Sequence, residues 1–243
     1  VTSIGNNAFN GCESLETVAI GKASQLQSIG NGVFGSTKIK TIYIPAKVTS
    51  IGQQPFFNST TLTTVDMSDV ESKTVNIGGW CFGYDKNVAP ANRPLRTFYV
   101  SNAGLIDRLT NKDNCIDNKG PRVENAAFVV TNGGTVDSRK TGLAAVSKAG
   151  YGVTWTSSNG TTVTNPEATT LSSGETYTAA WTLAAGNAEI TYNPNTSDAN
   201  DKNVVRVAVK GTDTTVAGAL FSRTGYTFTG WNTKADGAGT AYK

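Results

Sequence analysis

The 243-residue chain contains no histidine, one methionine and only three cysteines. The absence of histidine removes the usual general base, the most common metal ligand and every catalytic triad that is built on an imidazole. Serine–lysine sites and sites made of carboxylates alone are the chemistries that remain. We therefore expect no enzymatic activity, no cofactor and no metal centre in these residues.

The cysteines, Cys12, Cys81 and Cys115, are odd in number and lie far apart in the sequence. Their spacing fits neither a zinc knuckle nor a disulfide framework. Cys12 and Cys81 fall inside the repeats described below, where a thiol acts as a small apolar side chain. We expect buried structural thiols.

Neither sign of charge dominates, because 21 lysines and arginines face 18 aspartates and glutamates without a basic run. This balance predicts no nucleic-acid partner and no anionic membrane surface as a partner. No apolar stretch approaches the roughly 20 residues that a membrane span needs, so we expect no membrane insertion. The chain begins at Val1 and its last residue interrupts a motif, so we interpret it as a piece of a longer protein.

What the sequence does contain is a repeat. An Ile-Gly pair with a phenylalanine five residues after the isoleucine occurs at Ile4-Gly5 and Phe9, Ile29-Gly30 and Phe34, Ile51-Gly52 and Phe56, and Ile77-Gly78 and Phe82. A second phrase, Leu/Ile-x-Thr-apolar-x-apolar, occurs at 15–20, 39–44, 62–67 and 95–100. A period of this length is typical of leucine-rich solenoids, in which each repeat buries its apolar residues against its neighbours.

The second phrase alternates like a strand, so its apolar residues should point inward and the residues between them outward. Ile29 and Ile51 should be buried, and the glycine after each isoleucine should let the backbone turn tightly. Stacking then aligns outward columns, which supply a candidate ligand-binding face of Lys40, Tyr43, Asp66, Arg96 and Tyr99. Outward tyrosines on a rigid sheet are good anchors for a protein or glycan partner, although exposed tyrosines also occur without function.

The fourth repeat carries an insertion at residues 84–93, a loop length that is more often functional than a short connection. After Val100 the pattern stops, and residues 101–109 read as a capped helix with Leu105, Ile106 and Leu109 on one side. A terminal cap of this kind is what a solenoid needs.

These repeats resemble the BspA-like, or Treponema-type, leucine-rich repeats over about residues 1–122. The pattern Leu-x-x-Ile-x-Ile-Pro is matched by residues 39–45, Val-x-Ser-Ile-Gly by residues 48–52, and Ala-Phe-x-x-Cys by Ala8, Phe9 and Cys12. The resemblance implies a bacterial cell-surface protein that binds host or neighbour-cell ligands, and it brings no catalytic residue.

Beyond Glu124 two segments share a similar sequence pattern, which predicts two tandem units at 125–183 and 187–243. The second contains Arg223-Thr-Gly-Tyr-Thr-Phe-Thr-Gly-Trp231 and resembles a Listeria-Bacteroides repeat, also called the internalin B-repeat. That resemblance implies a small β-grasp fold, and residues 125–183 are a divergent copy. The second unit should lack its last strand, which would leave Trp231 more exposed than its counterpart in a complete unit. Trp155, Trp181 and Trp231 are expected to serve as core residues.

Two groups of carboxylates are candidate ligands for a cation. Asp66, Asp69 and Glu71 follow a repeat strand, and Asp198 and Asp201 lie in an Asn/Asp-rich stretch. Neither group has the regular alternation of an EF-hand loop. We interpret Asp198 and Asp201 as part of a solvated turn, with weak calcium binding as the alternative.

The sequence therefore predicts a mainly β fold: a leucine-rich-repeat solenoid with a short helical cap, then two small β-grasp-like units. The function that fits is an extracellular, adhesin-like binding protein of the bacterial cell surface or wall. Its solenoid would recognise an extracellular protein or glycan as a monomer, and its β-grasp units would form a stalk. The alternative is a non-catalytic accessory region of a larger extracellular enzyme.

Overall fold

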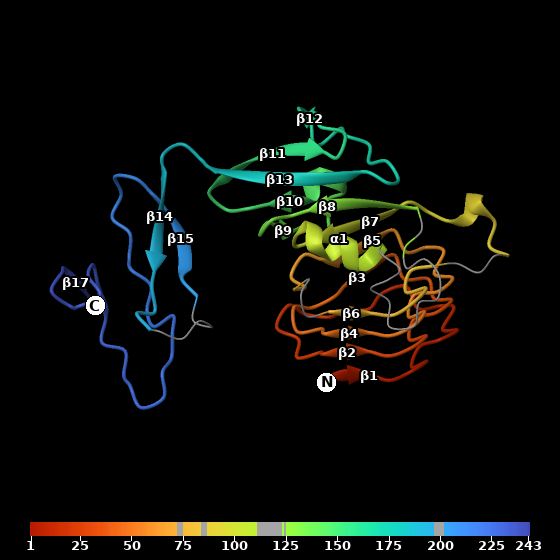
Figure 1. The fold of residues 1–243 in the computed structure, drawn as a ribbon, viewed down its shortest axis with the longest axis horizontal. Coiled ribbons are helices and arrows are strands. Elements are labelled where there is room, and N and C mark those ends of the chain that lie inside the picture. Colours follow the sequence, from red (N-terminus) through yellow and green to blue (C-terminus); the bar gives the residue numbers. More distant parts are fainter. Residues whose placement is uncertain (72–74, 84–86, 111–122, 124, 197–201) are drawn as a thin grey trace. The chain divides into compact units, whose positions relative to one another are not determined.

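The computed structural model describes residues 1–71, 75–83, 87–110, 123, 125–196 and 202–243. The chain divides into two compact units, Val1–Lys148 with Val153–Thr182, and Ala149–Gly152 with Leu183–Lys243. The fold is mainly β (Figure 1), and in the described residues the single α-helix is α1 (Ala103–Thr110).

The Ile-Gly phrases build one sheet of the first unit. Strands β1 (Ser3–Ile4), β2 (Ser28–Ile29), β4 (Ser50–Ile51) and β6 (Asn76–Ile77) pair in parallel and lie one above the next (Figure 1). The register places the four isoleucines opposite one another. Ile29 and Ile51 are buried, which confirms that prediction.

The phenylalanines of the same phrases form a stack inside the repeats. Ring centroids are 5.5 Å apart between Phe9 and Phe34, 5.4 Å between Phe34 and Phe56, and 5.0 Å between Phe56 and Phe82. Phe9 at the end of the stack remains 41 % exposed, whereas the next three rings are buried. One side chain per repeat therefore makes a continuous apolar column, as the pattern predicted.

The second phrase builds the other sheet, whose strand order is β12-β11-β13-β8-β7-β5-β3. Its repeat strands are β3 (Thr41–Tyr43), β5 (Thr64–Met67) and β7 (Arg96–Val100), all parallel. Their apolar residues face the isoleucine sheet, and Ile42, Val65 and Phe98 are fully buried between the two sheets. Residues 15–20 of the first repeat form no assigned strand.

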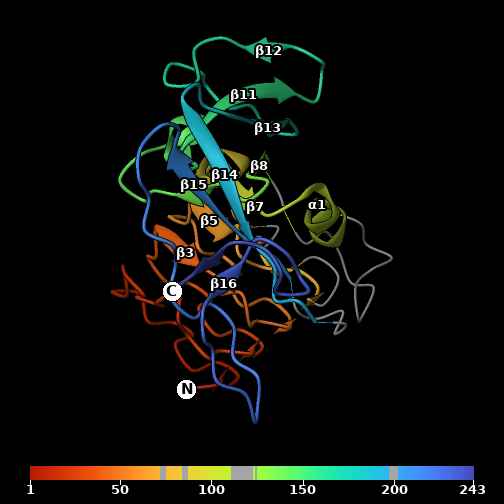
Figure 2. The ribbon, with the colours of Figure 1, turned by 90° about the vertical axis from the view of Figure 1, so that its left-hand side faces the viewer.

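Helix α1 covers one side of this core (Figure 2). Leu105 and Leu109 are buried and Ile106 packs against them, as expected from the sequence. The Asn102 side chain accepts a hydrogen bond of 2.9 Å from the Gly104 N–H, so it satisfies one of the amides that a helix start leaves unpaired.

Residues 126–182 continue the repeat sheet. Strand β8 (Ala126–Val130) pairs in parallel with β7 on one edge and with β13 (Thr176–Leu183) on the other, and β11 (Tyr151–Ser157) and β12 (Thr162–Val163) follow. The sequence suggested a boundary between residues 122 and 125, whereas the structure places both sides of it in one compact unit. All five residues of β8 are buried, so both of its faces are covered.

A second core forms on the other face of the extended sheet. Trp155, Tyr177 and Leu143 are buried there, and Trp181 packs against them. The short elements on this side are β9 (Thr135–Val136), η3 (Gly142–Ala145) and β10 (Val146–Ser147), with β9 and β10 antiparallel. Trp155 and Trp181 are thus core residues, as predicted.

The second unit contains two small antiparallel sheets. One pairs β14 (Asn187–Tyr192) with β15 (Val204–Val209), and the other pairs β16 (Trp231–Asn232) with β17 (Ala241–Tyr242). These pairs do not by themselves show the β-grasp fold that the resemblance implies. Asp198 and Asp201 lie outside the described residues.

The cysteine prediction is only partly correct. Cys81 is buried, but Cys12 is exposed. Cys115 lies outside the described residues. Within the described residues no helix is long and apolar enough to cross a membrane, and no group of three or more Cys, Asp or Glu side chains could hold a metal ion.

Candidate functional site

The candidate binding face lies on the second sheet of the repeats. Lys40 is exposed there and Tyr43 is half-buried. The other three predicted residues are buried, with 8 % of Asp66, 2 % of Tyr99 and none of Arg96 exposed. The expectation that all five side chains project into solvent is therefore wrong for Asp66, Arg96 and Tyr99.

Arg96 points into the core instead of away from it. Strand β7 alternates regularly along its pairing with β8, in which Arg96 is opposite Ala126, so Arg96 shares the inner face with Phe98. Its guanidinium donates to three backbone carbonyls: Nε to Leu62 at 3.1 Å, Nη2 to Ser59 at 2.9 Å, and Nη1 to Phe82. An arginine offers five donors in a fixed fork, which allows one side chain to satisfy carbonyls of its own repeat and of the preceding one.

Tyr99 points outward as predicted, but the second core covers it. It packs among the residues of that core, and its hydroxyl donates to the Gly142 carbonyl at 3.0 Å. Burial raises the pKa of the Tyr99 phenol to about 12, and the negative charge of Asp66 adds to the rise. The sequence pattern alone does not predict this burial, because it predicts residues 125–183 as a separate unit.

A polar cluster remains at the accessible end of this face. The Tyr43 hydroxyl donates to Asp69 at 2.8 Å, and the Lys22 ammonium lies 3.4 Å from the same carboxylate. Burial, followed by the hydrogen bond to Asp69, raises the pKa of the Tyr43 phenol above its ordinary value. Sequence reasoning missed Lys22, although Lys22 and Asp69 each follow their strand phrase by two residues and so occupy equivalent positions.

Asp66 lies next to Tyr43 in register and belongs to the same column. Its Oδ1 accepts hydrogen bonds from the Ser68 N–H at 3.0 Å and the Ser68 hydroxyl at 2.6 Å. Burial raises the pKa of the Asp66 carboxyl and the charge of Asp69 adds to the rise, whereas the Ser68 hydrogen bonds and Lys22 oppose it. The column therefore holds its side chains in fixed positions.

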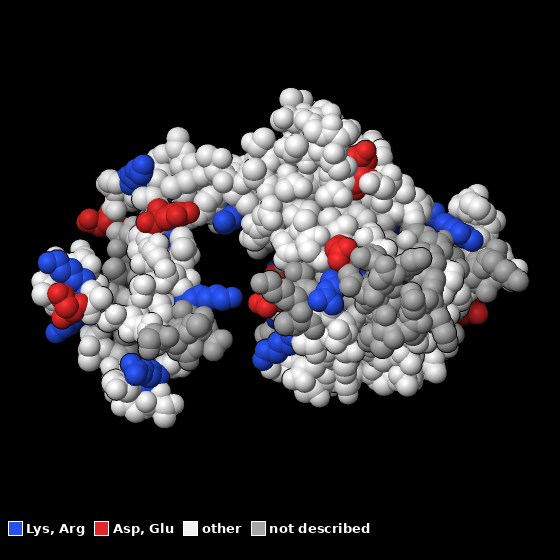
Figure 3. Space-filling model, in the orientation of Figure 1, with Lys and Arg blue, Asp and Glu red and all other residues white. Residues whose placement is uncertain are grey.

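The exposed residues of the neighbouring outward columns are of mixed charge. Lys40 and Glu16 form a 3.4 Å ion pair across two repeats, and Thr41 and Thr63 are open to solvent. On the face of the molecule that Figure 3 displays, basic and acidic side chains of the described residues are mixed and form no patch of one sign. The exposed surface thus offers hydroxyls, one aromatic ring and paired charges.

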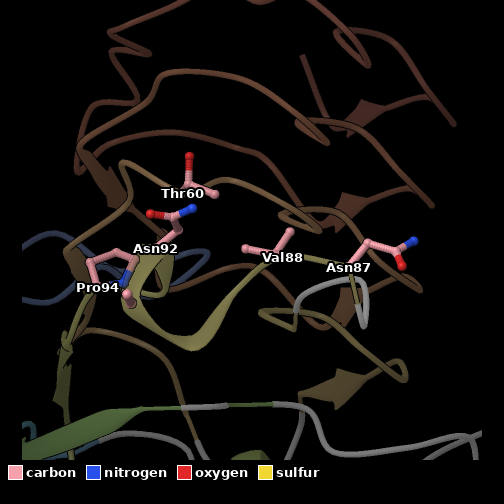
Figure 4. Close-up of a pocket in the computed structure, with 6 residues that line it drawn as sticks. Thr60, Asn87, Val88, Asn92 and Pro94 are labelled. Atoms are coloured by element: carbon pink, nitrogen blue, oxygen red, sulfur yellow. The ribbon is translucent and has the colours of Figure 1, made fainter.

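The insertion in the fourth repeat supplies a second candidate site. It contains η1 (Pro90–Asn92), and the Arg93 Nε donates to the Val88 carbonyl at 3.0 Å. A hollow of about 540 Å³ lies beside it (Figure 4). Its lining residues are Thr60, Asn87, Val88, Ala91, Asn92 and Pro94. Carboxamides and a hydroxyl in such a hollow can bind a polar ligand, but none of them is a catalytic acid or base.

The stacked, in-register strands define a repeat protein. Residues 1–97 match the family model of the BspA type leucine rich repeat region in six copies, and residues 189–243 match that of the Listeria-Bacteroides repeat domain. Both resemblances seen in the sequence are confirmed. A search of curated proteins and a search of solved structures found no match. Both repeats are typical of surface and adhesion-type proteins, and such repeats are typically non-catalytic.

Proposed function

We propose that this chain belongs to an extracellular, adhesin-like protein of the bacterial cell surface or wall, in which the repeats form a solenoid that binds an extracellular protein or glycan. Residues 126–243 would hold that binding region away from the cell, with a β-grasp fold in the Listeria-Bacteroides repeat. One observation carries the proposal: equivalent residues of successive repeats pair in register, Thr41 with Thr64 and Thr64 with Thr97. Such columns form a rigid surface of regular chemistry.

The binding surface is narrower than the sequence suggested. It centres on Lys40 and Tyr43, with Lys22 and Asp69 beside the tyrosine. Tyr43 is fixed by its 2.8 Å hydrogen bond, so its ring loses little conformational freedom when a partner binds. Rigid tyrosines with a polar tip are frequent anchors in interfaces.

The first experiment is a screen of the full chain against extracellular proteins and an array of glycans. Against each ligand found, Tyr43→Ala should weaken binding by about 2 kcal/mol, close to thirtyfold in Kd. Tyr43→Phe retains the ring but loses the hydrogen bond to Asp69, so it should weaken binding, though by less than Tyr43→Ala. Lys202→Ala removes an exposed lysine elsewhere in the chain and serves as the control for Lys40→Ala.

The hollow of the insertion is the competing location. If Tyr43→Ala and Lys40→Ala bind like the parent while Asn92→Ala abolishes binding, the ligand site is the insertion and not the sheet face. Loss of binding in the Lys202→Ala control would show that the assay responds to charge alone.

A further inference from the structure

The second unit contains an aromatic groove with a volume of about 1260 Å³. Its walls come from β14, from the segments at 214–223 and 226–235, the second of which includes β16, and from β17. Six aromatic side chains line it: Tyr192, Phe221, Tyr226, Phe228, Trp231 and Tyr242. A groove of this size could accommodate several units of a chain-like ligand.

The floor of the groove is held in place by Trp231. Its ring centroid is 4.7 Å from that of Tyr192, 5.0 Å from Phe228 and 5.9 Å from Phe221, each in an edge-on arrangement. Its Nε1 donates to the Ala217 carbonyl at 2.6 Å, while the Tyr192 hydroxyl accepts from the Ala217 N–H at 3.0 Å. These hydrogen bonds on both sides of one residue fix the two rings, so the floor is preorganised.

The rim presents aromatic rings to solvent. Tyr226 is 69 % exposed, Tyr242 45 % and Phe228 40 %. The Arg223 guanidinium lies 4.4 Å from the centroid of the Tyr226 ring, a cation–π arrangement that holds the charge at the mouth of the groove. The rim thus combines flat apolar surfaces with a positioned cation.

The charged residues that line the groove are Arg223 and Lys234, and both are positive. Neither side chain forms an ion pair within the described part of the chain. Asp236 lies between two lining residues, but its carboxylate closes the adjacent turn by accepting from the Ala238 N–H at 2.9 Å. The groove is therefore complementary in charge to an anion.

Four lining threonine and serine hydroxyls are also available. Those of Thr191, Thr214, Ser222 and Thr227 make no hydrogen bond to any residue that the structure describes. A hydroxyl can donate and accept, which matches the hydroxyls of a sugar. A pyranose ring has an apolar C–H face that fits an aromatic ring and a polar rim that fits these hydroxyls, so aromatic rings, hydroxyls and unpaired cations together suit a sugar that carries a carboxylate.

We propose that this groove binds an acidic saccharide, with Arg223 and Lys234 on its carboxylates and Tyr226 stacked on a sugar ring. The site lies in the region that would otherwise serve only as a stalk, and it is independent of the repeat face. Tyr43→Ala should therefore leave it unchanged, which separates its failure from that of the proposed function.

The experiment is calorimetric titration of the full chain with three carboxylate saccharides: tetragalacturonate, a hyaluronan tetrasaccharide and sialyllactose. Each is paired with its methyl ester, which keeps the sugar and removes the charge. At least one acid should bind. Its ester should bind at least about tenfold more weakly, since a hydrogen bond to a charged group contributes about that factor or more. Arg223→Gln and Lys234→Gln should each weaken binding by about the same factor.

Tyr226→Ala tests the stacking without opening the core, because the ring is largely exposed. Arg206→Gln, at an exposed residue of β15, is the matched control and should bind like the parent. The proposal is overturned if no acid binds at millimolar concentration, if acid and ester bind equally, or if a polyglutamate peptide binds more tightly than every saccharide. A dimer in sedimentation velocity that Tyr226→Ala dissociates would also overturn it, since a second copy would then occupy the groove.

Discussion

Gly78 lies directly against Gly52 of the preceding repeat, so that a Cβ built on Gly78 would be 2.5 Å from the Gly52 carbonyl carbon. Neither glycine has a positive φ, unlike the turn glycines elsewhere in the chain. The tight turn expected at this glycine from the sequence is therefore not the reason for it. The repeated glycine is required because successive backbones approach too closely for any side chain.

Gly78→Ala should therefore destabilise the repeats by about 1 to 3 kcal/mol, the usual cost of overpacking. Gly5 occupies the same place in the outermost repeat, where a Cβ would meet nothing within 4 Å. Gly5→Ala is thus a matched control and should melt like the parent. Thermal unfolding followed by circular dichroism distinguishes the two, and equal melting of both variants would contradict the stacking argument.

Substituting Arg96 should reduce the stability of the repeats by more than the burial of a charge alone suggests, because its guanidinium satisfies carbonyls from three different residues. Arg96→Lys keeps the charge but cannot reach all three, and a buried acceptor without a partner costs about 1 to 3 kcal/mol. We expect a loss of about 3 kcal/mol in the free energy of unfolding. Urea titration measures it, with Arg206→Lys on an exposed strand as the control. If Arg96→Lys lost no more free energy of unfolding than Arg206→Lys, the three hydrogen bonds would contribute nothing to stability.

Asp66 should make the first unit less stable as pH rises. Burial is the main cause that raises the pKa of its carboxyl in the folded state, so the folded chain holds this proton more tightly than the unfolded chain does. Its contribution to stability therefore falls as pH rises above the ordinary aspartate value of about 4. Asp66→Asn should melt higher than the parent at neutral pH, and the difference should vanish below about pH 3.5.

Melting curves from about pH 3 to 8 test this, with Asp213→Asn as a control at an exposed carboxylate. A lower melting temperature for Asp66→Asn at neutral pH would mean that the hydrogen bonds from Ser68 to the ionised carboxylate outweigh the effect of burial.

The sequence predicted the features that depend on the repeat itself. Equivalent residues of successive repeats stack in parallel. The alternation of inward and outward residues along each strand, together with the repeat length, therefore explains the burial of Ile29 and Ile51, the phenylalanine column and the outward threonines. The candidate face was predicted less well. Tyr99 is buried by the second core, which residues beyond the repeats form, and Arg96 points inward with the alternation of β7. One signal was present: the run at 126–130 is apolar throughout, as expected for a strand with both faces buried.

Tyr99 provides the sharpest test of whether residues 126–182 and the repeats unfold together. Tyr99→Phe removes only the hydrogen bond to Gly142 and should cost about 1 kcal/mol. Tyr99→Ala also removes a ring from the second core and should cost about 3 to 5 kcal/mol.

Because β7 carries Tyr99 on one face and Phe98 on the other, a defect on the second-core side should also weaken the pairing with β5. Hydrogen exchange followed by mass spectrometry should then show reduced protection in residues 62–67 as well as in residues 126–130. If only residues 126–182 lose protection in Tyr99→Ala, that segment unfolds on its own. The repeats and residues 126–182 would then be separate unfolding units, divided near the boundary expected from the sequence, although one sheet joins them.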